Sequence, residues 1–470
     1  MTTRVLTGFL VAAGLVQVAG AQSAPAGKKY KDGEFDIYSA SAKDVNSNSF
    51  AQAIKDLDTW KQKFPDTDYK NERQALYVTA YAGAGQFDKA VDAAGPMVNA
   101  GVDTIFGDPK DIGQAIRVLY TAASAIVHVA NPSADQLAVA DKAARQLLSY
   151  SRKPLGPDGK PVSDAAWDQL RAQLQPPAKA ALLYMAMLPG TQAMAAAKAD
   201  DKLAASQTGA EHDATLQKAQ QEYAAAEAAY TKALGDFPDQ TVISYNLALT
   251  LSAEKKNSEA VYEFERAAVL DATLGGGQPD PAGVKAFADK AYVKVHGKDD
   301  GLAELKDQVK QAPLWPAGFH IKTATEIAEE QQKKFEETYP QLAMWLKIKA
   351  ALSDTDGAQY FEGSLKGAAV PKLKGTLVDA KPACKPNTLL IAVPQPDDKP
   401  PFTAEIALKL DPPLTGKPAL DTEVEWAGVP SAFTQSPFLL TMDTEKTSID
   451  GLKVTPCTAA PAAHPAVKKK

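Results

Sequence analysis

The stretch that decides the fold runs from Tyr245 to Asp271 and reads YNLALTLSAEKKNSEAVYEFERAAVLD. It contains no Gly or Pro, and its apolar residues recur at the three- and four-residue spacing of a helix face. Alanine nevertheless stands at Ala248, Ala260 and Ala267, where a larger side chain would bury more apolar surface. Small residues let two helices approach closely, and a neighbouring aromatic ring can fill the remaining space. The stretch therefore predicts two closely packed helices joined by the polar turn EKKN.

The same pattern occurs one unit earlier in the chain. The segment 222–239, EYAAAEAAYTKALGDFPD, aligns with 257–273, NSEAVYEFERAAVLDAT, at an offset of 34 residues. A fixed period of this length in helical sequence is typical of stacked helix-turn-helix repeats. The matched pairs are Ala226 with Ala260, Tyr230 with Phe264, Ala233 with Ala267, and Pro238 with Ala272.

The period and the spaced residues resemble the tetratricopeptide repeat (TPR) family. Two residues depart from the family pattern: Ser244 stands where an aromatic is usual, and Ala272 replaces the usual Pro. The resemblance implies an open α-solenoid, because one repeat cannot bury its apolar face alone. An ordinary amphipathic helix bundle is the alternative. The residues expected to pack within the clearest repeat are Leu247, Ala248 and Leu251 in its first helix, and Ala260, Phe264 and Ala267 in its second.

The first helices of such a solenoid line a concave groove, and four residues are expected to face it: Tyr245, Asn246, Leu249 and Ser252. The amide of Asn246 can both donate to and accept from a peptide backbone. These residues could equally be ordinary inner-face positions with no ligand. The groove of this repeat lacks the Lys and Arg cluster that carboxylate binding would need.

The N-terminus has the features of a secretory signal peptide. Arg4 precedes an apolar run from Val5 to Val18, and Ala19-Gly20-Ala21 supplies small residues for cleavage after Ala21. An uncleaved anchor is the alternative. The mature protein is expected in the periplasm or outside the cell, and no later stretch is expected to span a membrane.

The remaining chain divides by composition. We expect a flexible leader over 22–48, a TPR-like helical domain over 49–353, a small all-β domain over 358–457 and a disordered tail over 458–470. The β region contains short runs of alternating apolar residues, which predict a small antiparallel barrel or sandwich. Two of these runs are Ile406, Leu408 and Leu410, and Phe438, Leu440 and Met442. It weakly resembles OB-like modules of bacterial envelope proteins. Its candidate ligand-stacking aromatics are Trp426, Phe433 and Phe438, although alternation favours the core for Trp426 and Phe438.

The chain has two cysteines, Cys384 and Cys457. In an oxidising compartment we expect them to form a disulfide that closes a long loop of the β domain. Two free thiols are the alternative, because the sequence alone does not fix the distance between the two Cα atoms.

No motif for catalysis or cofactor binding stands out. The five histidines are widely separated, no phosphate-binding loop occurs, and the formal net charge of −6 disfavours nucleic acid as a partner. Ser252 and Lys255 formally match a Ser-x-x-Lys pair, but they fall at the turn between two predicted helices. We expect no metal and no cofactor.

The sequence thus predicts a non-catalytic scaffold that binds another envelope protein or peptide through its helical repeats. Two alternatives stay open: a carbohydrate- or cell-wall-binding protein that acts through the β domain, and an enzyme whose catalytic residues are dispersed along the chain. The oligomeric state is left open.

Overall fold

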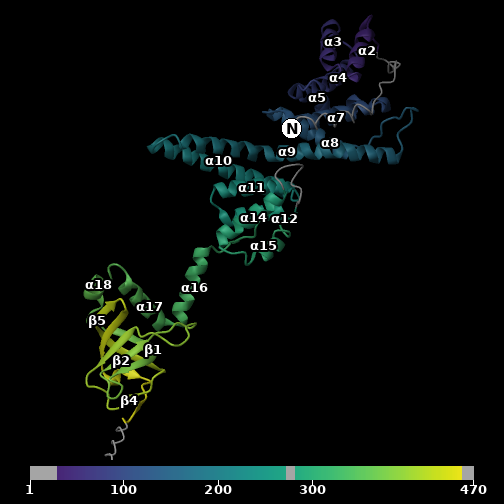
Figure 1. Ribbon diagram of the computed structural model, residues 1–470. Helices are drawn as coiled ribbons and strands as arrows, with labels where there is room; N and C mark the ends of the chain where they lie inside the picture. The colour runs from purple at the N-terminus through teal and green to yellow at the C-terminus, as the bar shows by residue number, and fades with distance from the viewer. Residues whose placement is uncertain (1–28, 271–280, 458–470) are drawn as a thin grey trace, which may run out of the picture. The chain divides into compact units, whose positions relative to one another are not determined.

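The computed structural model describes residues 29–270 and 281–457 of the 470-residue chain (Figure 1). The expected signal peptide and C-terminal tail lie outside the described residues. The chain separates into two compact units, Met1–Ile321 and Lys322–Lys470. The first is helical and the second contains a small closed β barrel. The expected order, a helical region followed by a small β barrel, is confirmed.

The first unit is built from helices that pack mainly on their neighbours in the sequence. Short turns join most of them, so successive helices pair as hairpins. In chain order they are α2 (Glu34–Asn46), α3 (Phe50–Lys63), α4 (Lys70–Gly83), α5 (Phe87–Ala100), α6 (Val102–Ile105), α7 (Ile112–Ala125), α8 (Ala134–Ser149), α9 (Asp164–Ala204), α10 (Gly209–Asp236), α11 (Thr241–Ala253), α12 (Asn257–Leu270), α14 (Pro281–His296) and α15 (Leu302–Gln308).

Helix α2 lies within the segment 22–48 that the sequence suggested as a flexible leader. Its Glu34 is fully buried. The Glu34 carboxylate accepts a hydrogen bond of 2.7 Å from Trp60 Nε1 on α3 and one of 2.9 Å from the backbone N–H of Lys31. A buried carboxylate is tolerated when its oxygens are bonded in this way. The composition of the segment hides this anchor, because a lone Glu in a polar stretch looks like a surface residue.

Helix α9 contributes to two hydrophobic clusters of the first unit. Its N-terminal half, including Trp167 and Leu170, packs with helices α3 to α8. Its C-terminal half, including Met194 and Ala197, packs with α10, α11 and α12. Contrary to the sequence expectation, α9 is long and apolar enough by length and composition to cross a membrane, with 28% of its apolar window buried. The packing of α9 into both clusters buries only part of this apolar window, and one such helix is by itself weak evidence of a membrane span.

Residues that are 34 positions apart in α10 and α12 pack in equivalent ways. Tyr230 and Phe264 are both buried, as are the alanines around them. Tyr230 lies directly against Gly190 of α9, where an added Cβ would come within 2.8 Å of its ring. A small residue facing a buried aromatic is the arrangement that the spacing predicted.

The second unit starts with two helices, α16 (Ala324–Thr338) and α17 (Pro340–Ser353). The sequence boundary at residue 353 grouped them with the helical repeats. No residue of α16 is buried, whereas Trp345 of α17 lies in the core of the barrel unit and donates from Nε1 to Glu405 over 2.8 Å. The short helix α18 (Gly357–Tyr360) and a π-helical turn, Phe361–Leu365, lead into the sheet.

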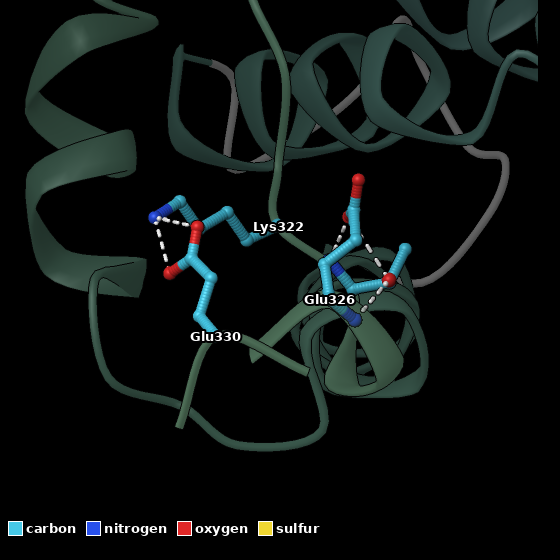
Figure 2. Close-up of polar contacts among 4 residues, drawn as sticks. Lys322, Glu326 and Glu330 are labelled. Carbon is cyan, nitrogen blue, oxygen red and sulfur yellow. Dashed lines mark hydrogen bonds and ion pairs between the residues drawn. The ribbon is translucent and has the colours of Figure 1, made fainter. Parts of the chain in front are cut away.

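Polar side chains reinforce the start of α16 (Figure 2). Thr323 Oγ1 accepts from the Glu326 backbone N–H at 3.2 Å, and the Glu326 carboxylate accepts from the Thr323 backbone N–H at 2.8 Å. This reciprocal pair is a capping box. Lys322 Nζ also contacts both carboxylate oxygens of Glu330 at 2.8 Å.

Five strands form the barrel, in the order β1-β2-β3-β6-β5, and β1 also pairs with β5 to close the ring. All these pairs are antiparallel except β3 with β6, which is parallel. The expectation of an all-antiparallel barrel is wrong at this pair, because strand directions cannot alternate all the way around a ring with an odd number of strands. The strands of the unit are β1 (Val370–Lys381), β2 (Thr388–Ala392), β3 (Ile406–Leu410), β4 (Lys417–Pro418), β5 (Thr422–Gln435), β6 (Phe438–Thr444), β7 (Ile449–Asp450) and β8 (Val454–Thr455).

The expected disulfide is present between Cys384 and Cys457, whose Cα atoms are 6.1 Å apart and which are 73 residues apart in sequence. Cys384 lies in the loop between β1 and β2, and Cys457 follows β8. The loop is also held by a hydrogen bond from the Lys385 backbone N–H to the carbonyl oxygen of Gly416. The bridge therefore ties the last described residues to one end of the barrel.

Candidate functional site

The four residues expected to line a groove share one face of α11. Tyr245, Asn246 and Leu249 are half-buried, and Ser252 is exposed. Their spacing places them on the side opposite Leu247 and Leu251, which are buried. The structure therefore brings the four residues together. The six expected packing residues lie inside: Leu247, Ala248, Leu251, Ala260, Phe264 and Ala267 are all buried.

A row of three aromatic rings extends this face across three helices. The ring centroids of Tyr245 on α11 and Phe264 on α12 are 6.0 Å apart, and those of Phe264 and Phe287 on α14 are 4.8 Å apart. Both contacts are edge-to-face, the geometry that aromatic pairs favour. We call Tyr245, Phe264 and Phe287 the aromatic row. Phe287 is 50% exposed, although it is a large apolar side chain.

Sequence reasoning missed Phe287 as a member of this site. Residues 271–280, which separate α12 from α14, lie outside the described residues. The 34-residue register also weakens after Ala272, so the pattern gave no alignment for α14. The available signal was the helical spacing of Val284, Ala288 and Tyr292, which are buried and place Phe287 at the border between the packed and the exposed side of α14.

Asn246 makes a local hydrogen bond. Its Nδ2 donates to the carbonyl oxygen of Val242, one turn earlier on α11, over 2.8 Å. One of the two amide donors is therefore satisfied within the helix. The second donor and the carbonyl oxygen Oδ1 are what Asn246 could offer to a ligand.

Arg266 fixes the helices beneath the aromatic row. It is buried on α12 and donates from Nη1 to Ser244 Oγ at 2.7 Å and from Nε to the carbonyl oxygen of Ala312 at 3.3 Å. It also donates to the carbonyl oxygen of Pro238. Ser244 is one of the two residues that depart from the repeat pattern that the sequence resembles. A hydroxyl that accepts from Arg266 stands at this position, and it joins α12 to α11.

Two further charged residues of α12 are fully buried. The carboxyl oxygens of Glu263 and Glu265 make no hydrogen bond in the described structure. Burial raises the pKa of Glu263 to about 8, and the nearby Ser244 and Arg266 lower it only in part. Burial also raises the pKa of Glu265 to about 7, although Lys306 Nζ lies 3.9 Å away. Glu263 is therefore mainly protonated at neutral pH, and Glu265 titrates near it.

The candidate aromatics of the barrel serve its core. Trp426 is fully buried, Phe438 packs on Trp345 at 6.0 Å, and Phe433 packs on Phe361 at 5.0 Å between ring centroids. Sugar binding by stacking needs an exposed ring face. None of these three residues is exposed.

The second unit also has a surface pocket of about 410 Å³ near the junction of α16 and α17. The Glu336–Lys347 ion pair, with a shortest distance of 2.9 Å, lies among the lining residues. Among the described residues, no cluster of three or more His, Cys, Asp or Glu side chains is arranged to hold a metal ion. The other lining residues are Pro340, Ala343, Met344, Ile348 and Tyr360.

Comparison with known proteins gives no relative from which a role could be transferred. No family model matches the chain, and no curated protein matches it. The surface features that could carry a function are therefore the aromatic row and the α11 face, by which we mean Tyr245, Asn246, Leu249 and Ser252.

Proposed function

We propose that the protein is an exported, TPR-like scaffold that binds another protein or peptide of the cell envelope and performs no catalysis itself. The observation that carries this proposal is the aromatic row. Phe287 and Tyr245 expose apolar surface beside the half-buried Leu249, on helices whose other sides are packed. Burying a fully exposed side chain of this kind contributes about 1.5–3 kcal/mol, and each of these partly exposed side chains would contribute a part of that at the centre of a binding site.

Hairpin packing supports the repeat assignment. Successive helices from α2 to α14 contact mainly their sequence neighbours, as stacked repeats do. The close approach of Gly190 and Tyr230 and the buried Ala260–Phe264–Ala267 set supply the small and aromatic positions of two units. Such a stack presents a surface without needing a ligand to hold it together.

The barrel fits a docking or structural role within this scaffold. Its strand order and its closure through β1 and β5 support the OB-like assignment. The disulfide suits an oxidising compartment and supports the proposed export. We do not propose carbohydrate binding as a second function, because Trp426 is buried and Phe433 and Phe438, which are half-buried, pack against Phe361 and Trp345.

The test is site-specific photo-crosslinking in intact cells. A benzophenone amino acid would be introduced at Leu249 or at Ser252, which lie on the α11 face, and at Asp168, an exposed residue of α9, as a matched control. We expect a defined crosslinked protein from Leu249 and Ser252 after ultraviolet exposure, and none of that size from Asp168. Crosslinks that are absent from both α11 positions, or equal at all three, would overturn the assignment of the binding face.

A further inference from the structure

Helix α14 packs with one face and turns a distinct second face to solvent. Val284, Ala288 and Tyr292 are buried on the packed face. The solvent face carries Phe287 and Val293, which are 50% and 39% exposed. Lys290 and Lys294 lie on the same face, because residues three, four and seven apart in a helix are neighbours. We call these four residues, Phe287, Lys290, Val293 and Lys294, the α14 face.

The α14 face is locally basic in an acidic protein. The chain has a formal net charge of −6, yet neither Lys290 nor Lys294 forms an ion pair with any described residue. The acidic residue of α14, Asp289, is bound instead by Lys306 of α15. Two ammonium groups are therefore left facing water beside exposed apolar side chains.

The α14 face continues into the α11 face. Phe287 packs edge-on against Phe264, which in turn contacts Tyr245. An apolar side chain placed on Phe287 would therefore lie at the end of the aromatic row, with Lys290 one turn further along α14. This arrangement places apolar contact and positive charge at a spacing that one short peptide can span.

We propose that the α14 face binds an acidic segment of a partner protein, with an apolar side chain of that segment against Phe287 and Val293 and its carboxylates at Lys290 and Lys294. The inference rests on the scaffold function proposed above and adds the chemistry of the partner. Charge complementarity selects the partner: unpaired ammonium groups attract carboxylates, and the rest of the acidic surface repels an acidic chain that approaches elsewhere.

An anionic membrane surface is the competing occupant for a basic face with apolar residues. The α14 face offers only two lysines, whereas electrostatic attachment to anionic lipid typically uses clusters of four to eight. The apolar area is also small, since Phe287 and Val293 are its two large side chains. The observations therefore favour a peptide, and vesicles serve as a second probe in the test.

The test begins with an unbiased probe. A phage library of random 12-residue peptides would be selected on the immobilised full chain. We expect enriched peptides in which Asp or Glu flanks Phe, Leu or Trp. One enriched peptide would then be synthesised with a fluorophore, and its affinity measured by fluorescence anisotropy at low and high salt. We expect binding to weaken as salt rises, because exposed charges are screened.

Matched variants locate the binding site. The double change Lys290→Glu and Lys294→Glu is expected to weaken peptide binding at least tenfold, and Phe287→Ala about tenfold. The control is Lys198→Glu with Lys202→Glu, two exposed lysines of α9, which alters net charge equally and should leave binding within twofold. Circular dichroism would verify that each variant is folded, which is expected because all these side chains are exposed.

Three outcomes would overturn the proposal: no enrichment, enriched peptides without acidic residues, or an acidic peptide whose affinity the α14 variants leave unchanged. Binding to phosphatidylglycerol vesicles, lost in the lysine variant and accompanied by no peptide binding, would assign the face to a membrane. The scaffold function is tested separately. Crosslinks from Leu249 and Ser252 that persist in the α14 variants would support the scaffold function while contradicting the α14 proposal, whereas crosslinks that are absent from both positions in the natural chain would overturn the scaffold function itself.

Discussion

Two helices of nearly equal length, α12 and α16, are used in opposite ways. Helix α12 has 14 residues, of which nine are buried, including Glu263, Glu265 and Arg266. Helix α16 has 15 residues and none is buried. Both sequences mix charged and apolar residues, so composition does not separate them. The two helices are stabilised in different ways. Helix α12 is stabilised by packing and hydrogen bonds to neighbouring helices, whereas α16 is stabilised by polar contacts at its own N-terminus.

This contrast teaches that charge is a poor guide to exposure in a stack of helices. Each inner helix has neighbours on several sides, so some of its polar side chains must become buried. Arg266 is tolerated because each of its three side-chain nitrogens donates a hydrogen bond, and Glu263 because it can hold a proton. Helix α16 has no such constraint and carries its charges in water. Substitutions in α12 should therefore change the stability of the protein much more than substitutions in α16.

The largest effect is expected from Arg266→Ala. The change removes the hydrogen bonds of Arg266 to Ser244 and to the carbonyl oxygens of Pro238 and Ala312, of which Ala312 keeps a second donor, the hydroxyl of Tyr262. Loss of such a buried charged group costs about 3–5 kcal/mol. Urea denaturation followed by circular dichroism should show this loss in the transition of the first unit. The control on α16 is Lys333→Ala, an exposed residue, for which a change below about 0.5 kcal/mol is expected.

The next expected effect is that the stability of the folded protein depends on pH through Glu263 and Glu265. Their pKa values are raised from 4.5 to about 8 and about 7 in the folded protein, so the folded state holds protons that the unfolded state has released. These two carboxyl groups therefore make their full contribution to the stability of the folded state below pH 4.5. The contribution declines as the pH rises to about 8 and changes no further above that.

Replacing both residues by glutamine tests this directly. The variant Glu263→Gln with Glu265→Gln should resemble the natural chain at pH 5 and be more stable at pH 8.5, as measured by urea denaturation at each pH. The matched control is Glu329→Gln with Glu337→Gln on α16, which removes the same charge from exposed positions. A stability difference between pH 5 and pH 8.5 that is identical in all three proteins would show that the buried pair does not titrate as described.

The sequence predicted the packed half of the site better than the exposed half. Ala260, Phe264 and Ala267 were identified because burial imposes residue size at fixed spacing, and that constraint is visible in one sequence. The strands Ile406–Leu410 and Phe438–Thr444 were found for the same reason, since alternation reports which side is buried. The disulfide followed from the number of cysteines.

Other features depend on contacts that have no local pattern. The α14 contribution was missed because Phe287 meets Phe264 across a segment that breaks the repeat period. The anchor of α2 was missed because Glu34 and Trp60 are 26 residues apart and look unrelated. The parallel β3–β6 pair follows from closing an odd ring of strands, which no single strand sequence encodes.

A smaller effect is expected from Thr323→Ala at the start of α16. The change removes the acceptor for the Glu326 backbone N–H and breaks the capping box. N-cap substitutions of this kind typically cost about 1 kcal/mol. Because α16 lacks buried residues, the loss should appear as faster amide exchange across this helix in hydrogen-exchange mass spectrometry. Thr323→Ser retains the hydroxyl and should restore slow exchange; if both variants exchange alike, the cap does not stabilise the helix.

The smallest effect is expected from the ion pair between Lys322 and Glu330. Both side chains are more than half exposed, so solvent screens their attraction even though Nζ lies 2.8 Å from both carboxylate oxygens. Exposed pairs of this kind contribute about 0.2–1 kcal/mol and lose strength in salt. Glu330→Gln should therefore speed amide exchange in α16 only slightly at low salt and not at all in 0.5 M salt. An effect as large as that of Thr323→Ala, or one that salt does not reduce, would mean that this ion pair stabilises α16 more than an exposed pair can. The contrast with α12 would then need an explanation other than burial.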